Sequence, residues 1–300
     1  MLVSAECIPC YLQQAINTLE KGEVPRAKWN GLLKQLLPLI SSLPDDKTPA
    51  ENSTIVIHRL AEMLGGNDPF FKAKEESNKR ALSYIKDLRR TISGSEDPLF
   101  TALKISVAGN VVDLGLFDDF DLTQALEDAL KFDFTINDYD RFKQDIAKAK
   151  TVLIIGDNSG EIVFDRLLAE QLRTMHKDVF YGVKGGFILN DATIQDAYTA
   201  GLPEVACVIT NGNSYLGTVE KYCSEEFLTV FRNADTVISK GQANYESLEG
   251  TVLAGEKTYF LLKAKCPLVA KHLGVRYGAL VFKRNAVDSE QLTVNSEKLA

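Results

Sequence analysis

The chain has 300 residues, of which 45% are hydrophobic and 25% charged, the balance of a globular protein that is long enough for a buried core. Its net charge of −7 and its pI near 5.2 argue against nucleic acid or an acidic membrane as a partner. Because no apolar run approaches the roughly 20 residues of a membrane span, and Glu6 interrupts the start where a secretory leader would be apolar, we expect a cytoplasmic protein.

The first half of the chain, residues 1–149, has helical spacing throughout. Leucines recur every three or four residues in the segment 29–40, which predicts one apolar helix face. Gly65-Gly66 and Asp68-Pro69 are typical stop and start signals of helices. The predicted helices cover residues 29–40, 54–64, 69–92 and 98–114, and two shorter ones begin at Asp121 and at Asn137 or Asp138. We therefore expect an N-terminal helical domain over residues 1–149.

From residue 150 onward, apolar stretches of about five residues alternate with helical segments. The predicted strands are residues 151–155, 178–183, 205–209, 235–238, 258–262 and 278–283. Such alternation is typical of βαβ units, in which helices cover both faces of a mainly parallel sheet. We predict an α/β fold with three layers, α/β/α, formed by a domain of residues 150–300, with the helical domain packed against it.

Polar clusters follow four of the predicted strands. The clusters occupy residues 156–161, 184–193, 211–218 and 239–246. The carboxyl ends of parallel strands lie along one edge of a sheet, and ligands of open α/β sheets bind there. We therefore expect Asp157, Asn158, Asp191 and Lys240 to converge although they lie far apart in the sequence.

These converging groups suit a metal ion and a phosphate. Two Asp carboxylates and an Asn carbonyl oxygen form a hard, oxygen-only set that is typical of Mg²⁺ or Mn²⁺ sites. A lysine near helix N-termini suits a phosphate, and flanking glycines let backbone N–H groups approach an anion. A metal that activates water, with a cation that offsets charge on the phosphoryl oxygens, is what phosphate-ester hydrolysis needs.

Each of these residues also has a structural explanation. Asp, Asn, Ser and Gly at strand–helix turns often only cap helices. Lys240 alone would usually be a solvated surface residue, and the helix dipole favours an acid such as Glu161 in a first turn. Four clusters at one sheet edge, two of them with adjacent acid and amide groups, favour a functional site.

Five motifs in order along the chain resemble one known family. They are GDNSGEIVFD at 156–165, ILNDAT at 188–193, NGNSYLGT at 211–218, ADTVISKGQANYESL at 234–248 and FLLKAKCPLVAKHLGV at 260–275. The family is DUF89, the damage-control phosphatases, which includes ARMT1-like proteins. Two further segments, CIPC at 7–10 and FTALKISVAGNVVDLG at 100–115, are similar to its shorter, prokaryotic-type branch.

The resemblance implies a metal-dependent phosphatase that acts on small phosphorylated metabolites, such as sugar phosphates or damaged cofactor intermediates. It implies a divalent metal, Mg²⁺ or Mn²⁺ with Co²⁺ or Ni²⁺ as further candidates, bound by Asp157, Asn158 and Asp191. The catalytic residues would be Asp157, Glu161 and Asp191, and the substrate or its phosphate would be bound by Lys240, Gly241, Asn244 and Asn110. One departure is Ala243, which stands where the family has Gly.

The mechanism and two rival functions stay open at this point. A metal-bound water that attacks phosphorus, with Glu161 or Asp191 as base, is favoured over a covalent aspartyl-phosphate on Asp157, because the acid-x-acid pattern of that route is absent. An S-adenosylmethionine-dependent carboxyl methyltransferase is one alternative, although the first turn lacks G-x-G-x-x-G. A noncatalytic protein that binds metal or sugar phosphate is the other.

The cysteines and histidines add one unexplained motif. Five cysteines, an odd number, predict no disulfide framework. Cys7 and Cys10 begin a predicted helix and would place two sulfurs on one face. A structural zinc usually takes four ligands, so packing is favoured over a metal or redox role. The three histidines lie outside the polar clusters, which weakens any zinc–histidine or Ser–His hypothesis.

Overall fold

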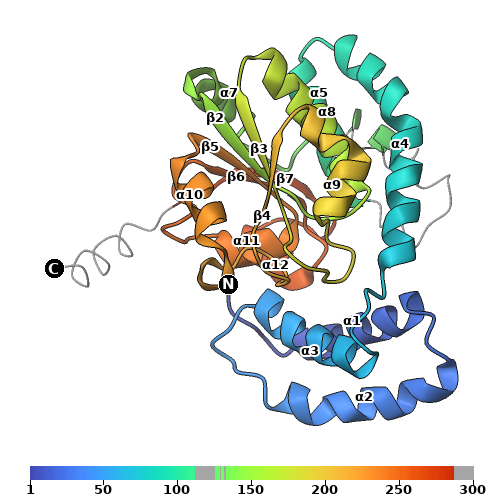
Figure 1. Ribbon diagram of the computed structural model, residues 1–300. Helices are drawn as coiled ribbons and strands as arrows, with labels where there is room; N and C mark the ends of the chain where they lie inside the picture. Colours follow the sequence, from blue (N-terminus) through green and yellow to red (C-terminus); the bar gives the residue numbers. More distant parts are fainter. Residues whose placement is uncertain (112–125, 129, 132, 287–300) are drawn as a thin grey trace.

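The computed structural model describes residues 1–111, 126–128, 130–131 and 133–286, with the side chains of residues 110 and 111 excepted. Its centre is a seven-stranded sheet in the order β1-β7-β6-β5-β2-β3-β4 (Figure 1). The strands are β1 (Ile136–Asn137), β2 (Thr151–Ile155), β3 (Asp178–Val183), β4 (Cys207–Thr210), β5 (Thr236–Lys240), β6 (Thr258–Lys263) and β7 (Leu280–Arg284). All neighbouring strands in the sheet are parallel except β6 and β7. The predicted α/β class is confirmed.

The helices cover both faces of this sheet and form a separate group at one end (Figure 1). The α-helices are α1 (Cys7–Lys21), α2 (Arg26–Ser41), α3 (Pro49–Met63), α4 (Phe71–Ser93), α5 (Pro98–Val111), α7 (Tyr139–Lys148), α8 (Glu161–Thr174), α9 (Ile194–Ala200), α10 (Glu225–Asn233), α11 (Gln242–Leu248) and α12 (Pro267–Leu273). Two short 3₁₀ turns, Leu202–Glu204 and Glu220–Tyr222, complete the described elements.

Alternation along the strands divides the apolar residues between two cores. Val152 and Ile154 face the core under α4, α5, α7, α8 and α9, whereas Leu153 and Ile155 face the core under α10, α11 and α12. A strand buried on both faces is apolar throughout, which is why β2 could be predicted from its sequence. The three layers are therefore α/β/α, as predicted.

Six of the seven strands coincide with predicted ones. The segments 151–155 and 178–183 match in full, and the other four differ by one or two residues at one or both ends. The strand that was not predicted is β1, which lies inside the segment expected to be entirely helical and pairs with Val281 and Phe282 of β7. A strand of two residues is too short for an alternating pattern of apolar and polar residues to be recognised in the sequence. The start of the helix predicted at Asp121 lies outside the described residues, whereas residues 126–128 and 130–131 are described and helical.

Helices α1, α2 and α3 pack around their own core, which includes Leu19, Trp29 and Leu36. Leu268, at the start of α12, also packs against it. In Figure 1 these three helices, coloured blue, lie beside α11 and α12. Helices α4 and α5 instead share the core of the sheet. The boundary at residue 149 stays a prediction. No helix within the described ranges combines the length and apolar character that crossing a membrane requires.

Candidate functional site

Two loops at the carboxyl edge of the sheet bring the first three predicted residues together. Asp157 and Asn158 follow β2, and Asp191 lies in the loop after β3. The Ala192 N–H donates to the Asp157 carbonyl at 2.8 Å, and the Ser159 N–H donates to the Asn190 carbonyl at 2.9 Å. Asn158 and Asp191 thereby form an isolated antiparallel bridge. The expected convergence of these loops therefore has a backbone basis.

Helix capping does not account for these side chains. The N-cap of α8 is Gly160, with a φ of 80° and no side-chain cap. Helix α9 begins after Thr193, whose backbone N–H donates to Asp196 at 2.9 Å. Asp157, Asn158 and Asp191 are thus held in place without serving as caps.

Asp157, Asn158 and Asp191 line a cavity of about 280 Å³. The opposite wall comes from the first helices, through Cys7, Cys10, Tyr11 and Gln14 of α1 and Ala50 and Ser53 of α3. Gln242, Ala243 and Glu246 of α11 and Lys265, Cys266 and Leu268 at the start of α12 complete much of the rim. The site therefore lies between the sheet edge and the N-terminal helices.

Gly241 sits directly against the Asp157 carboxylate. A Cβ atom at position 241 would lie 2.0 Å from Asp157 Oδ2, and its φ of 78° already favours glycine. The sequence suggested Gly241 as a backbone contact to phosphate. In the structure Gly241 has a different role. Because glycine has no side chain, the Asp157 carboxylate can lie directly against the backbone at position 241.

Burial makes the two cavity carboxylates costly to ionise. Burial raises the pKa of Asp157 well above its usual range, and the neighbouring Glu161 and Asp191 raise it further. Burial also raises the pKa of Asp191 to about 6, although Lys184 acts in the opposite direction. Asp191 Oδ2 makes no hydrogen bond within the described part of the chain, and its nearest partner there is the Lys184 ammonium, at 3.5 Å. This long ion pair leaves the oxygen able to accept a further cation.

Lys240, at the end of β5, is completely buried, so the solvated-surface explanation is wrong. Its Nζ lies 2.6 Å from Glu161 Oε1 and 2.5 Å from Asp165 Oδ1, and it donates to the Ser106 carbonyl at 3.2 Å. It does not line the cavity. A direct contact of Lys240 with phosphate stays a prediction, and its described contacts are those of a cation enclosed by carboxylates.

Glu161, the first residue of α8, is also fully buried. Besides Lys240, its carboxylate accepts a hydrogen bond from Asn158 Nδ2 at 3.2 Å. The same Nδ2 donates to Asp157 Oδ2 at 2.8 Å. Asp157 and Asn158 line the cavity, whereas Glu161 does not. Glu161 therefore contacts these two predicted metal ligands on the side that faces away from the cavity.

Two asparagines were expected in the cleft, and the structure describes the side chain of Asn244 but not that of Asn110. Asn244 of α11 is buried, donates to the carbonyls of Gly156 and Lys240 at 3.2 and 2.8 Å, and accepts from the Thr218 hydroxyl at 2.8 Å. These bonds hold α11 to the ends of β2 and β5. The side chain of Asn110, in α5, lies outside the described residues.

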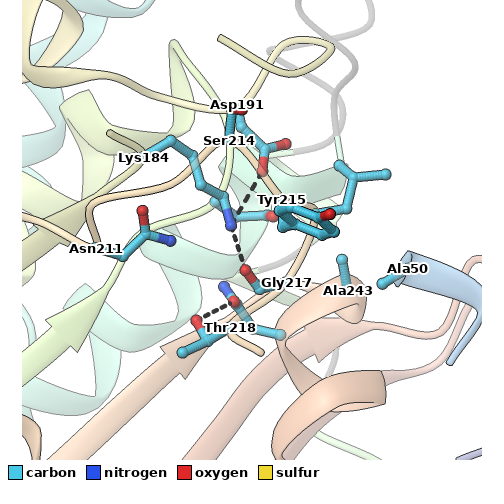
Figure 2. Close-up of polar contacts among 12 residues, drawn as sticks. Ala50, Lys184, Asp191, Asn211, Ser214, Tyr215, Gly217, Thr218 and Ala243 are labelled. Atoms are coloured by element: carbon cyan, nitrogen blue, oxygen red, sulfur yellow. Dashed lines mark hydrogen bonds and ion pairs between the residues drawn. The ribbon is translucent and has the colours of Figure 1, made fainter. Parts of the chain in front are cut away.

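Lys184 was not singled out from the sequence, although it directly follows β3. Figure 2 shows its ammonium between Asp191 and Gly217: Nζ donates to the Gly217 carbonyl at 2.5 Å and lies 3.5 Å from Asp191 Oδ2. The side chain is almost completely buried. Lys184 stands at a strand end, directly before the glycine pair Gly185-Gly186, and this pattern could have identified it from the sequence.

One group of ionisable side chains fits a divalent cation, and we call it the buried charge cluster. It consists of the carboxylates of Asp157, Glu161, Asp165 and Asp191 and the ammonium groups of Lys184 and Lys240. Four negative and two positive charges leave a net charge of −2 when every group is ionised. No three His, Cys, Asp or Glu side chains among the described residues have the spacing to hold a metal. The predicted set instead has two carboxylates and one amide, and such sites keep several water ligands.

A protein-family model, the damage-control phosphatase ARMT1-like domain, matches residues 3–281. The chain belongs to this family. An uncharacterized protein of Methanocaldococcus jannaschii is 36% identical over 284 residues, which cover 92% of this chain and 93% of that protein. The damage-control phosphatase of Pyrococcus horikoshii is 33% identical over 95% of this chain and 99% of its own.

The solved structure of a DUF89 family protein from Pyrococcus horikoshii has a TM-score of 0.88 and 32% sequence identity, and the match covers 95% of this chain and all of that one. Membership of the ARMT1-like family confirms the resemblance that the five motifs indicated. Because the Pyrococcus relative is named a phosphatase, the comparisons favour a phosphatase over a methyltransferase.

Proposed function

We propose that this protein is a divalent-metal-dependent phosphatase that hydrolyses small phosphomonoesters. The observation that carries the proposal is the meeting of Asp157, Asn158 and Asp191, from two separate loops, on one wall of a cavity. Asp191 Oδ2 is buried there, and among the described residues its contact is the 3.5 Å ion pair with Lys184 rather than a hydrogen bond. These three residues would hold the metal, which when bound would activate water and offset charge on the phosphoryl group.

The donor set favours Mg²⁺ or Mn²⁺, because both prefer oxygen ligands. Co²⁺ and Ni²⁺ are further candidates. The substrate would be a small phosphorylated metabolite, such as a sugar phosphate or a damaged phosphometabolite, since the cavity has room for a molecule of that size. The name of the Pyrococcus horikoshii damage-control phosphatase supports this class.

Lys265 is the lysine that lines the cavity, and its side chain is exposed. It can therefore move toward the phosphate of a bound substrate, whereas Lys240 is enclosed behind Glu161. Asp191 faces the cavity and Glu161 does not. Of the two bases considered, Asp191 is thus the better placed to accept a proton from the attacking water.

The test is phosphate release from p-nitrophenyl phosphate by the purified chain with Mn²⁺ and with Mg²⁺. We expect near-total loss of activity in Asp157→Ala and after exhaustive chelation. Asp178→Asn is the matched control, because Asp178 begins β3 at the opposite edge of the sheet and is exposed. Full activity after chelation would refute the metal-dependent mechanism.

Two further measurements refine the proposal. A panel of phosphorylated metabolites, assayed with each of the four metals, identifies the preferred substrate class. Rapid quenching followed by mass spectrometry tests for a covalent phosphate on Asp157. We expect none, and a phosphorylated Asp157 would replace direct attack by water with a two-step mechanism.

A further inference from the structure

A buried polar network lies behind the cavity, and Asp165 is at its centre. Asp165 Oδ2 accepts from the Tyr181 hydroxyl at 2.7 Å, and Oδ1 accepts from the Ser106 hydroxyl at 2.5 Å and from Lys240 Nζ at 2.5 Å. All four side chains are fully buried. Neither oxygen of this carboxylate faces the cavity, so Asp165 cannot touch a substrate.

The network continues from Asp165 to the predicted metal ligands. Lys240 Nζ is shared between Asp165 Oδ1 and Glu161 Oε1, at 2.5 and 2.6 Å. The other Glu161 oxygen, Oε2, accepts from Asn158 Nδ2, which also donates to Asp157 Oδ2. Glu161 and Asp165 are four residues apart on α8 and so share one helix face.

These contacts fix the orientation of the Asn158 amide. Its NH₂ group lies between two carboxylate oxygens, where only a donor is favourable. The opposite orientation would place Oδ1 against both carboxylates. The carbonyl oxygen, which is the atom that could bind a metal, is therefore turned away from Glu161. An amide free to rotate would present the oxygen to the metal for only part of the time.

We propose that Asp165 is a positioning residue for the metal site, acting through Lys240 and Glu161 to orient Asn158. In this arrangement Asp165 holds Lys240, Lys240 holds Glu161, and Glu161 holds the amide. Glu161 thereby acts as a support for a metal ligand and not as the base. The inference rests on the proposed metal-dependent function, because it assigns a role to residues behind that metal's ligands.

The first experiment is Mn²⁺ binding by isothermal titration to the wild type, Asp165→Asn and Tyr181→Phe. Residues that hold a metal's ligands typically contribute about 10–100-fold to metal affinity. We expect a loss in that range for Asp165→Asn. Tyr181→Phe keeps the Asp165–Lys240 pair that leads to Asn158, so its loss of Mn²⁺ affinity is expected to be clearly smaller than that of Asp165→Asn. Wild-type affinity in a folded Asp165→Asn would overturn the proposal.

A double variant, Asp165→Asn with Lys240→Met, separates positioning from charge. Asp165→Asn alone reduces the net charge of the buried charge cluster from −2 to −1, whereas the double variant restores −2. The double variant leaves the buried Glu161 carboxylate without its Lys240 partner, so thermal unfolding first checks that it folds. Weak Mn²⁺ binding by the double variant supports positioning, and recovery to wild-type affinity would refute it.

A different result separates the two proposals. If the wild-type protein does not bind Mn²⁺ at all, the metal-dependent function fails, and this inference fails with it. If the wild type binds Mn²⁺, and Asp165→Asn and the double variant bind it equally well, only the role of Asp165 is refuted.

Discussion

At the scale of single residues, the absence of a side chain at Gly241 shapes the site as much as the carboxylates do. Asp157 Oδ2 occupies the space that a Cβ at position 241 would take. The carboxylate can therefore lie close to the backbone that leads from β5 into α11. A methyl group there would push Asp157 away from Asn158 and Asp191.

We predict that Gly241→Ala abolishes most phosphatase activity and Mn²⁺ binding. Gly250→Ala is the matched control, because Gly250 has a similar φ of 74° with no atoms within 4 Å of the added methyl. Both variants place a side chain on a residue with positive φ, which costs about 1–3 kcal/mol. Thermal unfolding should therefore show a loss of stability in both, while titration calorimetry shows lost Mn²⁺ binding in Gly241→Ala alone. Equal Mn²⁺ affinity in the two variants would contradict the prediction.

Individual site residues could be predicted from the sequence where they lie in the loops that follow strands. Asp157 and Asn158 follow β2, Asp191 lies in the loop between β3 and α9, and each lines the cavity. The pairing of lysines with acids could not be predicted, because it depends on which side chains meet across the sheet. Asp165 and Lys240 are 75 residues apart, and the sequence offered only the spacing of Glu161 and Asp165 along α8 as a hint.

At the scale of elements, α1 explains why the CxxC motif stands where it does. Helix α1 begins at Cys7, and its first turn brings Cys7 and Cys10 to the wall of the cavity, with Cys266 of the α12 N-cap on the same wall. Burial raises the pKa of the Cys10 thiol, and the nearby Cys266 and Cys7 raise it further. A metal would have to displace this proton in order to bind the sulfur, which weakens a thiolate site near neutral pH.

We predict that Cys7→Ser with Cys10→Ser leaves the Mn²⁺ affinity within about threefold of the wild type, because Mn²⁺ prefers the oxygen ligands of the proposed site to sulfur. Elemental analysis of the purified protein is expected to find no zinc that depends on these cysteines. The exposed Cys207 provides a control variant, Cys207→Ser. Loss of a bound metal in the double variant alone would restore the metal-ligand hypothesis for the CxxC motif.

Strands with apolar residues on both faces could be predicted well, since continuous burial gives them a recognisable composition. The strand β1 had no such composition, because its two residues form a strand only by pairing with β7. The contribution of α1 and α3 to the cavity wall was missed for a similar reason. Helical periodicity identifies a buried face but does not say which neighbour buries it.

At the scale of the whole molecule, Glu246 links stability to pH. It lies on α11 at the cavity and is largely buried. Burial raises its pKa from 4.5 to about 7, while Gln242 and the N-terminal amine act in the opposite direction. A pKa raised by folding means that the folded state prefers the protonated acid. This contribution is fully present below pH 4.5 and is lost as the pH rises through 7.

We predict that Glu246→Gln becomes more stable relative to the wild type as the pH increases from 5 to 8. The expected gain in the free energy of unfolding is at most about 3 kcal/mol. Urea denaturation at both pH values measures it. Glu226→Gln is the control, since Glu226 is exposed on α10. A difference between Glu246→Gln and wild type that stays constant with pH would contradict the prediction.

The pairing of β1 with β7 has a consequence for how the chain folds during synthesis. Ile136 and Asn137 of β1 are joined by hydrogen-bonded pairing to Val281 and Phe282 of β7. The ribosome therefore releases one partner long before it makes the other. The edge of the sheet at β1 can close only after β7 has also emerged from the ribosome. Until then, the exposed edges of β1 and β6 need protection from pairing with other nascent chains.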